Sequence, residues 1–400
     1  MTEIPPLSIL DTLRPEVQPH IYEHYDEIRS ASGVFRDKQL RAWLVTERDL
    51  VMGALTDKDL SSVRYADLDA VDEQIRPLFA TLGKQLFYLD APDHPRIRTL
   101  MNRSFSPKTV AAMRAQIERT TDSLLDAVNS QSSIDILADL AYPLPVSVIC
   151  DLLDVPPEQR AQVKRWSSAV AIVMGKAKPS PEELSDGVQA MSSMLDYLGE
   201  LLLQQRQNAT SVVFEAFLGS SDVSDDEILA NAAALLLVGH ETTTNLISNG
   251  MLALLQHPEQ LALLRERPEL IKPAVEELLR YDSSVQNLLR RSINGTTIGD
   301  QEITAGSTVL LVLGAANRDP KAYADPHVLD IQRDGPRHVA FGHGVHACIG
   351  ASLARLEAEI VLPKLLERYE HLHLTDEPLQ WHASLTFRGL HSLPVDTVSR

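Results

Sequence analysis

The sequence has few cysteines, little basic charge and no long apolar segment, and each shortage excludes a class of protein. Cys150 and Cys348 are too few for a disulfide framework and do not form a C-x-x-C zinc motif. The net charge of −18 argues against a nucleic-acid-binding protein, because such proteins need a basic surface. The apolar run at residues 232–238 is too short to cross a membrane, and the N-terminus lacks a signal-peptide pattern. We therefore expect a cytoplasmic protein with no membrane contact.

Apolar residues at helical spacing dominate the middle of the chain, from about residue 107 to residue 281. The longest predicted helix is continuous over residues 228–255. Strand-like alternation is rarer and is clearest at residues 42–46, 296–313 and 384–395.

No repeat, linker or low-complexity segment divides the chain. The pair Gly299-Asp300 is typical of a hairpin turn. We therefore predict a mainly α protein with a minor β portion, formed by a single domain over residues 1–400.

Cys348 lies in the glycine-rich segment FGHGVHACIG, which precedes an amphipathic helical segment. Backbone N–H groups at the start of a helix stabilise a thiolate, and the glycines leave room for a turn and for a large flat ligand. Such a sulfur could be a nucleophile, with His346 as its base, or a metal ligand. Cys150, in an apolar segment, fits ordinary packing.

The segment EELLRY places Glu277 and Arg280 three residues apart, where they can pair on one helical face. Most pairs with this spacing are solvated. A buried pair would instead be costly to break and would serve the structure.

The segment LLLVGHETTTN carries Gly239, Glu241 and three threonines between apolar flanks. One interpretation is a helix whose hydroxyl groups bond to carbonyls of the preceding turn. The other is a local helix distortion that leaves room above a cofactor.

In DAPDHPRIRTLMNRSF, His94 and Arg98 are four residues apart and share a helical face. They could lie on an ordinary surface helix or donate to buried carboxylates. Arg290 and Arg291 are adjacent, so on a strand only one of them can face a given side.

The cysteine segment fits the pattern F-x-x-G-x-H-x-C-x-G and resembles the haem-binding loop of cytochromes P450. The other three segments resemble further motifs of that family and occur in its order, over roughly residues 10–400. The resemblance implies the cytochrome P450 fold, a haem b cofactor and Cys348 as the axial ligand of its iron.

The resemblance also implies roles for other residues. Thr242 and Glu241 would be catalytic, in O2 activation and proton relay, and Glu277 and Arg280 would form a buried structural pair. The haem propionates would be bound by His94, Arg98, Arg290 and His346.

A monooxygenase of this kind inserts one oxygen atom of O2 into a lipophilic small molecule, by hydroxylation or epoxidation of a natural product. The substrate-contact candidates are Leu78, Phe79, Phe87, Val238, Asn287, Leu288, Leu289, Thr386 and Phe387, which could equally be core residues. Electrons would come from a separate ferredoxin and ferredoxin reductase. These partners would dock on a monomer at a basic patch of Lys108, Arg114, Arg337 and His338.

Several alternatives stay open. Within the same fold they are a peroxide-driven enzyme and a coupling or desaturation enzyme. Outside it they are a haem-thiolate sensor without turnover and a cysteine-dependent hydrolase.

Overall fold

A computed structural model of the chain describes residues 7–64, 68–69, 71–176 and 179–399. The helices are α1 (Ile21–Ala31), α2 (Arg48–Thr56), α3 (Arg76–Leu82), α4 (Asp93–Ser104), α5 (Pro107–Val128), α6 (Pro143–Leu152), α7 (Arg160–Gly175), α8 (Pro181–Gln207), α9 (Val212–Leu218), α10 (Asp225–Val238), α11 (Glu241–Gln256), α12 (Pro258–Glu266), α13 (Ile271–Tyr281), α14 (Leu313–Ala316) and α15 (Ala351–Arg368). The strands are β1 (Val34–Asp37), β2 (Ala42–Val45), β3 (Leu60–Ser61), β4 (Ser133–Asp135), β5 (Asn287–Ser292), β6 (Thr296–Ile298), β7 (Gln301–Ile303), β8 (Thr308–Val312), β9 (Tyr369–Leu374) and β10 (Pro394–Ser399).

Local sequence signals set the ends of the long helices. Ser180 and Glu183 form a capping box at the start of α8, and Ser224 and Glu227 form another at the start of α10. Each box satisfies N–H groups that the first helical turn leaves without partners. Helix α5 begins at Pro107, directly after the capping hydroxyl of Ser106.

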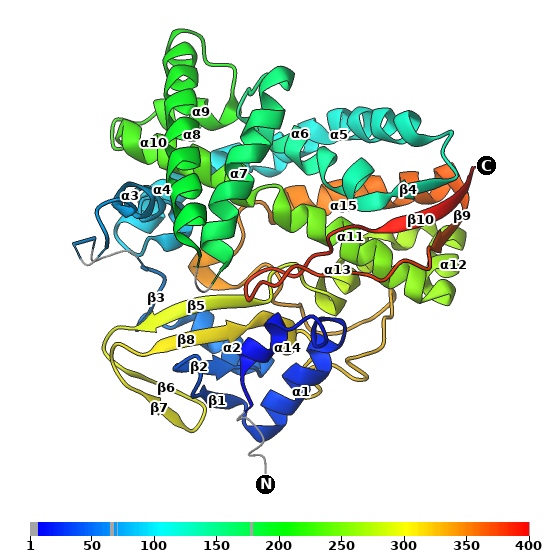
Figure 1. Ribbon diagram of the computed structural model, residues 1–400, viewed down its shortest axis with the longest axis horizontal. Coiled ribbons are helices and arrows are strands. Elements are labelled where there is room, and N and C mark those ends of the chain that lie inside the picture. Colours follow the sequence, from blue (N-terminus) through cyan, green and yellow to red (C-terminus); the bar gives the residue numbers. More distant parts are fainter. Residues whose placement is uncertain (1–6, 65–67, 70, 177–178, 400) are drawn as a thin grey trace.

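The helices and a three-stranded sheet of order β4-β10-β9 form the larger part of the molecule, and a five-stranded sheet with α1, α2, α14 and the β6–β7 hairpin lies on one side of it (Figure 1). The strand order is β1-β2-β8-β5-β3, with β2 and β8 parallel and the other neighbours antiparallel. Helix α11 runs through the helical part and contacts α6, α13 and α15. The predicted mainly α class with a minor β portion is therefore confirmed. None of the helices in the described part of the chain combines the length and hydropathy that a membrane span requires.

The prediction of one continuous helix over residues 228–255 is wrong. Helix α10 ends at Val238 and α11 begins at Glu241. Gly239 lies where a side chain has no room: a Cβ there would be 2.4 Å from the Leu235 carbonyl oxygen and 2.9 Å from the side chain of Ile149. The backbone thus breaks where α6 comes closest to it.

The strand expected at residues 384–395 is also largely wrong, because β10 begins only at Pro394. Before it, the chain lies against α11 and does not join a ladder. A Cβ on Gly389 would be 2.1 Å from Asn245 Oδ1, and the Asn249 side chain donates to the Arg388 carbonyl at 2.9 Å. Contacts to α11 and two isolated bridges, Phe387 with Val285 and Leu390 with Trp381, therefore take the place of a continuous ladder.

The other strand predictions are confirmed. β2 occupies most of residues 42–46, and β6 pairs with β7 across Gly299, whose φ of +56° suits the hairpin turn.

Candidate active site

An apolar cavity of about 220 Å³ lies between the α10–α11 break and the cysteine loop. Thr242, Val238 and Leu246 line it from one side, and Cys348 lies on the other. Cys348 is exposed within this cavity, whereas Cys150 is buried among apolar residues. The Cys348 sulfur is therefore available to a ligand, whereas the Cys150 sulfur only packs in the core.

The shape of the cysteine loop depends on two glycines with positive φ, Gly342 at +67° and Gly344 at +73°. A Cβ on Gly344 would lie 2.9 Å from the Thr56 side chain, so α2 leaves no room for another residue. The Cys348 N–H donates to the Phe341 carbonyl at 2.8 Å and closes the loop. Three residues later, α15 begins.

Two hydrogen bonds and two positive charges act on the Cys348 sulfur. Burial has the largest effect and leaves the pKa of the thiol raised, while the backbone N–H groups of Gly350 and Ala351 and the charges of Arg98 and Arg355 act in the opposite direction. These four groups favour a thiolate, which is the form that ligates a metal.

A cationic cluster lies beside the sulfur. Arg290 on β5 is 6% exposed, and its guanidinium donates to the Leu289 carbonyl at 3.0 Å but, within the described chain, to no carboxylate. Burial, together with the charge of Arg64, lowers the pKa of Arg290 to about 10. Asp90 is the nearby carboxylate, 3.6 Å from the Nε2 atom of His346.

Helix α4 contributes His94 and Arg98 to this cluster. The rings of His94 and His346 have centroids 4.1 Å apart, and the Nε2 atom of His94 is buried without a partner in the described chain. Arg98 donates to the Ala347 carbonyl at 2.7 Å, which ties α4 to the cysteine loop. Burial lowers the pKa of both side chains.

Two guanidinium and two imidazole groups thus share one carboxylate beside an exposed thiol. That surplus of donors fits a ligand with two carboxylates and a metal centre, as haem has. The residues present are therefore suited to hold haem. Arg291 points away from the cluster and is exposed, as alternation on a strand predicts.

Glu241 and Thr242 are the first two residues of α11, directly after the break, and they face different cavities. The Thr242 hydroxyl donates to the Val238 carbonyl at 3.2 Å and lines the cysteine cavity. Glu241 lines a second cavity, on the other side of the break, and burial raises the pKa of its carboxyl. The two neighbours therefore face different compartments.

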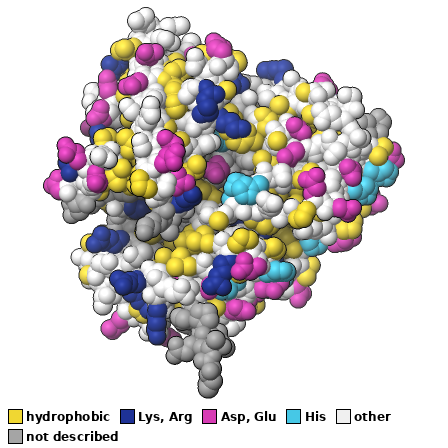
Figure 2. All heavy atoms as spheres, viewed as in Figure 1, with side chains coloured by type: hydrophobic (Ala, Val, Ile, Leu, Met, Phe, Trp, Pro, Cys, Tyr) yellow, Lys and Arg dark blue, Asp and Glu magenta, His cyan; other side chains and the backbone are white. Residues whose placement is uncertain are grey.

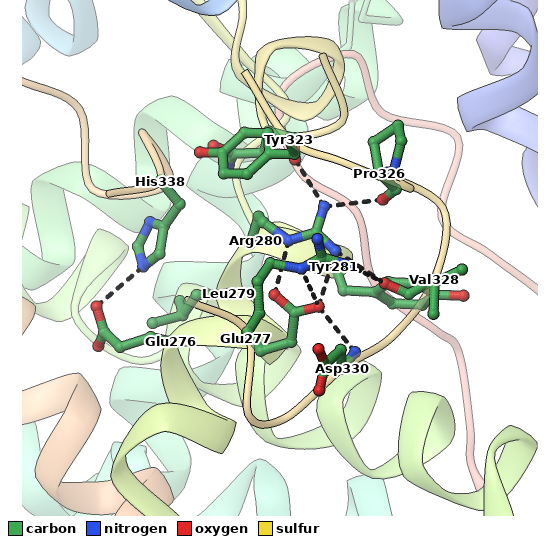
Figure 3. Close-up of polar contacts among 12 residues, drawn as sticks. Glu276, Glu277, Leu279, Arg280, Tyr281, Tyr323, Pro326, Val328, Asp330 and His338 are labelled. Carbon is green, nitrogen blue, oxygen red and sulfur yellow. Dashed lines mark hydrogen bonds and ion pairs between the residues drawn. The ribbon is translucent and has the colours of Figure 1, made fainter. Parts of the chain in front are cut away.

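Glu277 and Arg280 form a buried pair on α13, with atoms 2.7 and 2.8 Å apart (Figure 3). Arg280 also donates to the carbonyls of Asn317, Pro326 and Val328, at 2.8 to 3.1 Å. Glu277 accepts from the Asp330 N–H at 3.0 Å. The pair thus anchors the chain that leads to the cysteine loop.

The neighbouring carboxyl, Glu276, binds the cysteine loop from the same helix. Burial alone would raise its pKa, but contacts with His338 and Arg355 lower it to about 2. The Arg355 guanidinium also lies 4.5 Å from the ring centroid of Phe341. His338 is paired with Glu276 at 3.3 Å and has only 6% of its side chain exposed, so it does not belong to the predicted basic patch.

Few of the predicted substrate contacts lie on the cysteine cavity. Val238 and Leu288 line it, whereas Phe387 lines the second cavity. The other candidates lie elsewhere. Leu78, Phe79 and Phe87 pack in the helical core, and Leu289 packs against the core beside α1. Asn287 and Thr386 form hydrogen bonds that join the 385–387 segment to the chain at the start of β5.

The structure adds lining residues that the motifs did not reveal, among them Phe105, Ile149 and Glu357. Helical spacing offered one usable signal, since Leu235, Val238, Thr242 and Leu246 recur on one face. Glu357 interrupts the apolar face of α15, and its Oε2 atom is buried without a partner in the described chain. Nothing in the sequence placed Ile149 beside Gly239.

Comparisons with known proteins agree with this geometry. The cytochrome P450 family model matches residues 44–390. The chain is 37% identical to cytochrome P450 107B1 of Saccharopolyspora erythraea over 98% of each chain, and 36% identical to 6-deoxyerythronolide B hydroxylase of the same organism over 94% of this chain and 95% of that one. The crystal structure of P450BioI in complex with an acyl carrier protein ligated to hexadec-9Z-enoic acid has a TM-score of 0.92 at 34% identity, covering 96% of this chain and 100% of that one. The chain belongs to the cytochrome P450 family.

Proposed function

We propose that this cytochrome P450 is a monooxygenase that inserts one oxygen atom of O2 into a lipophilic natural product, by hydroxylation or epoxidation. The observation that carries the proposal is the exposed Cys348 in an apolar cavity that Thr242 also lines. Mostly apolar walls favour a lipophilic substrate. The relative named as a 6-deoxyerythronolide B hydroxylase supports a substrate of this class.

The cofactor of this proposal is haem b, with Cys348 as its axial ligand and His94, Arg98, Arg290 and His346 as donors to its propionates. When bound, the haem supplies the iron centre at which O2 and electrons react. The hydrogen-bonding groups of the cluster support this assignment, because two carboxylates would supply the partners that Arg290 and the His94 Nε2 atom lack in the described chain.

Side chains of the protein itself transfer protons to the cavity and exclude water from it. The Thr242 hydroxyl lies at the helix break, where it can exchange its bond to the Val238 carbonyl for one into the cavity. Glu241, the preceding residue of α11, lines the second cavity and is placed to replace the proton that Thr242 passes on. The apolar walls exclude bulk water, which strengthens polar contacts inside.

Electrons reach the protein from a separate ferredoxin and ferredoxin reductase, and the protein acts as a monomer. Lys108, Arg114 and Arg337 are exposed and remain candidates for the docking surface, although Arg114 pairs with Glu118 at 3.4 Å. We expect reduction by ferredoxin to slow as salt concentration rises. A rate independent of salt would refute docking through these charges.

The first test is the absorption spectrum of the reduced, CO-bound holoprotein. Thiolate ligation predicts a strongly red-shifted Soret band, which Cys348→Ser should abolish while the fold is retained. A band typical of histidine ligation, or a colourless protein, would overturn the assignment.

A peroxide-driven enzyme of the same fold is the second candidate. It would not need proton delivery, and the Glu241–Thr242 pair at the break therefore disfavours it. Thr242→Ala should divert O2 to hydrogen peroxide and lower the coupling of electron use to product. Unchanged coupling would favour the second candidate.

A further inference from the structure

A second cavity, of about 560 Å³, lies across the helix break from Cys348. It is bounded by α7, by the start of α11 and by the segment 382–391. Among the described residues, it shares no lining side chain with the cysteine cavity. Figure 2 shows a hollow at the centre of this face, with histidine side chains beside it. The break is thus a thin partition between an apolar chamber and a cavity that opens towards solvent.

The second cavity has polar walls without enough protein partners. The hydroxyls of Tyr142 and Thr244 are buried and have no partner in the described chain, and Thr244 is 4% exposed. Burial, and then the charge of Glu241, raise the pKa of Tyr142. Because buried polar groups are satisfied by protein or by ordered water, and this space is large enough for several molecules, these walls are suited to a chain of water.

A pair of histidines lines the same cavity. The rings of His382 and His391 have centroids 3.8 Å apart. Backbone bonds fix both residues: the His382 N–H donates to the Gly389 carbonyl at 3.0 Å, and the His391 N–H to the Gln380 carbonyl at 2.8 Å. Burial, and then His391, lower the pKa of His382. Charging two imidazoles this close together is unfavourable, so a proton on one of them is readily given up.

We infer that the second cavity carries protons from solvent to Glu241, and that the His382–His391 pair supplies them through a chain of water. The inference rests on the proposed function and identifies its proton source. An imidazolium of the pair releases H⁺ to water, and the water chain delivers H⁺ to the Glu241 carboxylate, which becomes a carboxylic acid. Solvent then protonates the pair again, and no electrons move along this path.

Other ionisable groups at this cavity do not replace the pair. His240 is neutral near neutral pH, because burial lowers its pKa to about 4. Lys176 forms an ion pair with Glu183, and Lys164 lies 4.0 Å from the ring centroid of Tyr142. The His382–His391 pair therefore remains as the proton donor of this wall, since imidazole takes up and releases protons more readily than the paired lysine does.

The test compares two double variants of the holoprotein. His382→Gln/His391→Gln removes the proposed source. His371→Gln/His373→Gln is the matched control, because that pair stacks with centroids 5.9 Å apart on β9, away from the cavity. Dithionite-reduced protein is mixed with O2 in a stopped-flow instrument without substrate. The proton-dependent return of its spectrum to the ferric form is followed against pH.

In the wild type we expect this return to slow as pH rises through the range in which the pair loses its proton, which the lowered pKa of His382 places below the ordinary histidine value of 6.5. The His382/His391 variant should be about 10-fold slower and should lose that pH dependence, since bulk water is a poorer donor than a positioned acid. Wild-type behaviour in this variant, or equal slowing in the control, would overturn the inference.

The reduced, CO-bound spectrum of the same samples distinguishes a failure of the inference from a failure of the proposed function. A missing red-shifted band refutes the proposed function, and with it the inference, whereas an intact band with unchanged kinetics refutes only the proton source.

A high-resolution crystal structure of the holoenzyme gives a second readout. We expect ordered water bonded to Tyr142 Oη and Thr244 Oγ1 and continuous from His391 to Glu241. Side chains or a dry apolar gap filling that space would contradict the inference.

Discussion

Arg280 and Arg290 are almost equally buried, at 2% and 6% exposed, but their surroundings differ completely. Arg280 is paired with Glu277 and bonds to three backbone carbonyls. Arg290 bonds to the carbonyl of its own neighbour and, in the described chain, lacks a carboxylate partner. A buried charge that is fully paired holds the structure together. A buried charge without enough partners, such as that of Arg290, indicates a ligand-binding site.

Removing the paired arginine should have the largest effect. Arg280→Met leaves Glu277 buried with only Arg333 as a charged partner, at 3.1 Å, and should cost about 3–5 kcal/mol of unfolding free energy. Urea unfolding measures this. The control, Arg267→Met, breaks an exposed pair with Glu269 and should cost less than about 1 kcal/mol. Equal losses would show that burial does not distinguish the two pairs.

Removing the unpaired arginine should affect the cofactor and not the fold. Arg290→Gln should weaken haem retention by about 10- to 100-fold, the worth of one charge-assisted hydrogen bond. The haem-free protein should unfold no more easily, because a poorly paired buried charge has been removed. The rate of haem loss to an excess of haem-binding apoprotein gives the first quantity. Arg291→Gln on the same strand is the control, and an equal loss of haem there would contradict the assignment.

Removing the carboxylate that pairs with an arginine nearer the surface should have the smallest effect. The hydrogen bond from Arg96, followed by burial, which opposes it, sets the pKa of Glu227 at about 2, below its ordinary 4.5. The folded state thus binds the Glu227 proton more weakly than the unfolded chain. Its stabilisation is therefore present above about pH 4.5 and is lost as pH falls towards 2. Glu227→Gln should cost about 1 kcal/mol near neutral pH and clearly less at about pH 3, by urea unfolding, since both side chains are partly exposed. A loss that does not change with pH would assign the effect to the cap of α10 and not to the charge.

The sequence anticipated what depends on residue spacing along one element. His94 and Arg98 share a face of α4, Glu277 and Arg280 pair on α13, and Arg290 and Arg291 face opposite sides of β5. Each follows from the period of a helix or a strand. The cysteine loop was readable because its glycines allow conformations that other residues avoid.

The features that could not be predicted from the sequence depend on contacts between segments that are far apart in the chain. Ile149 packs against Gly239 at the helix break, and in the 382–391 segment Gly389 packs against Asn245 while the Arg388 carbonyl accepts from the Asn249 side chain. The position of Glu241 on a separate cavity follows from that break. No periodic pattern encodes these contacts, so a continuous helix and a strand were the natural but incorrect expectations.

The pairing of β2 with β8 has a consequence for how the protein is made. Residues 42–45 lie in the middle of the sheet, yet their partner is Thr308–Val312, and Tyr22 bonds to Asp282 at 2.8 Å. During synthesis, the edge of β2 that pairs with β8 therefore stays uncovered until most of the chain has left the ribosome. Contacts between residues so far apart also slow folding. Truncation from the C-terminal side should leave these strands exposed and prone to aggregate.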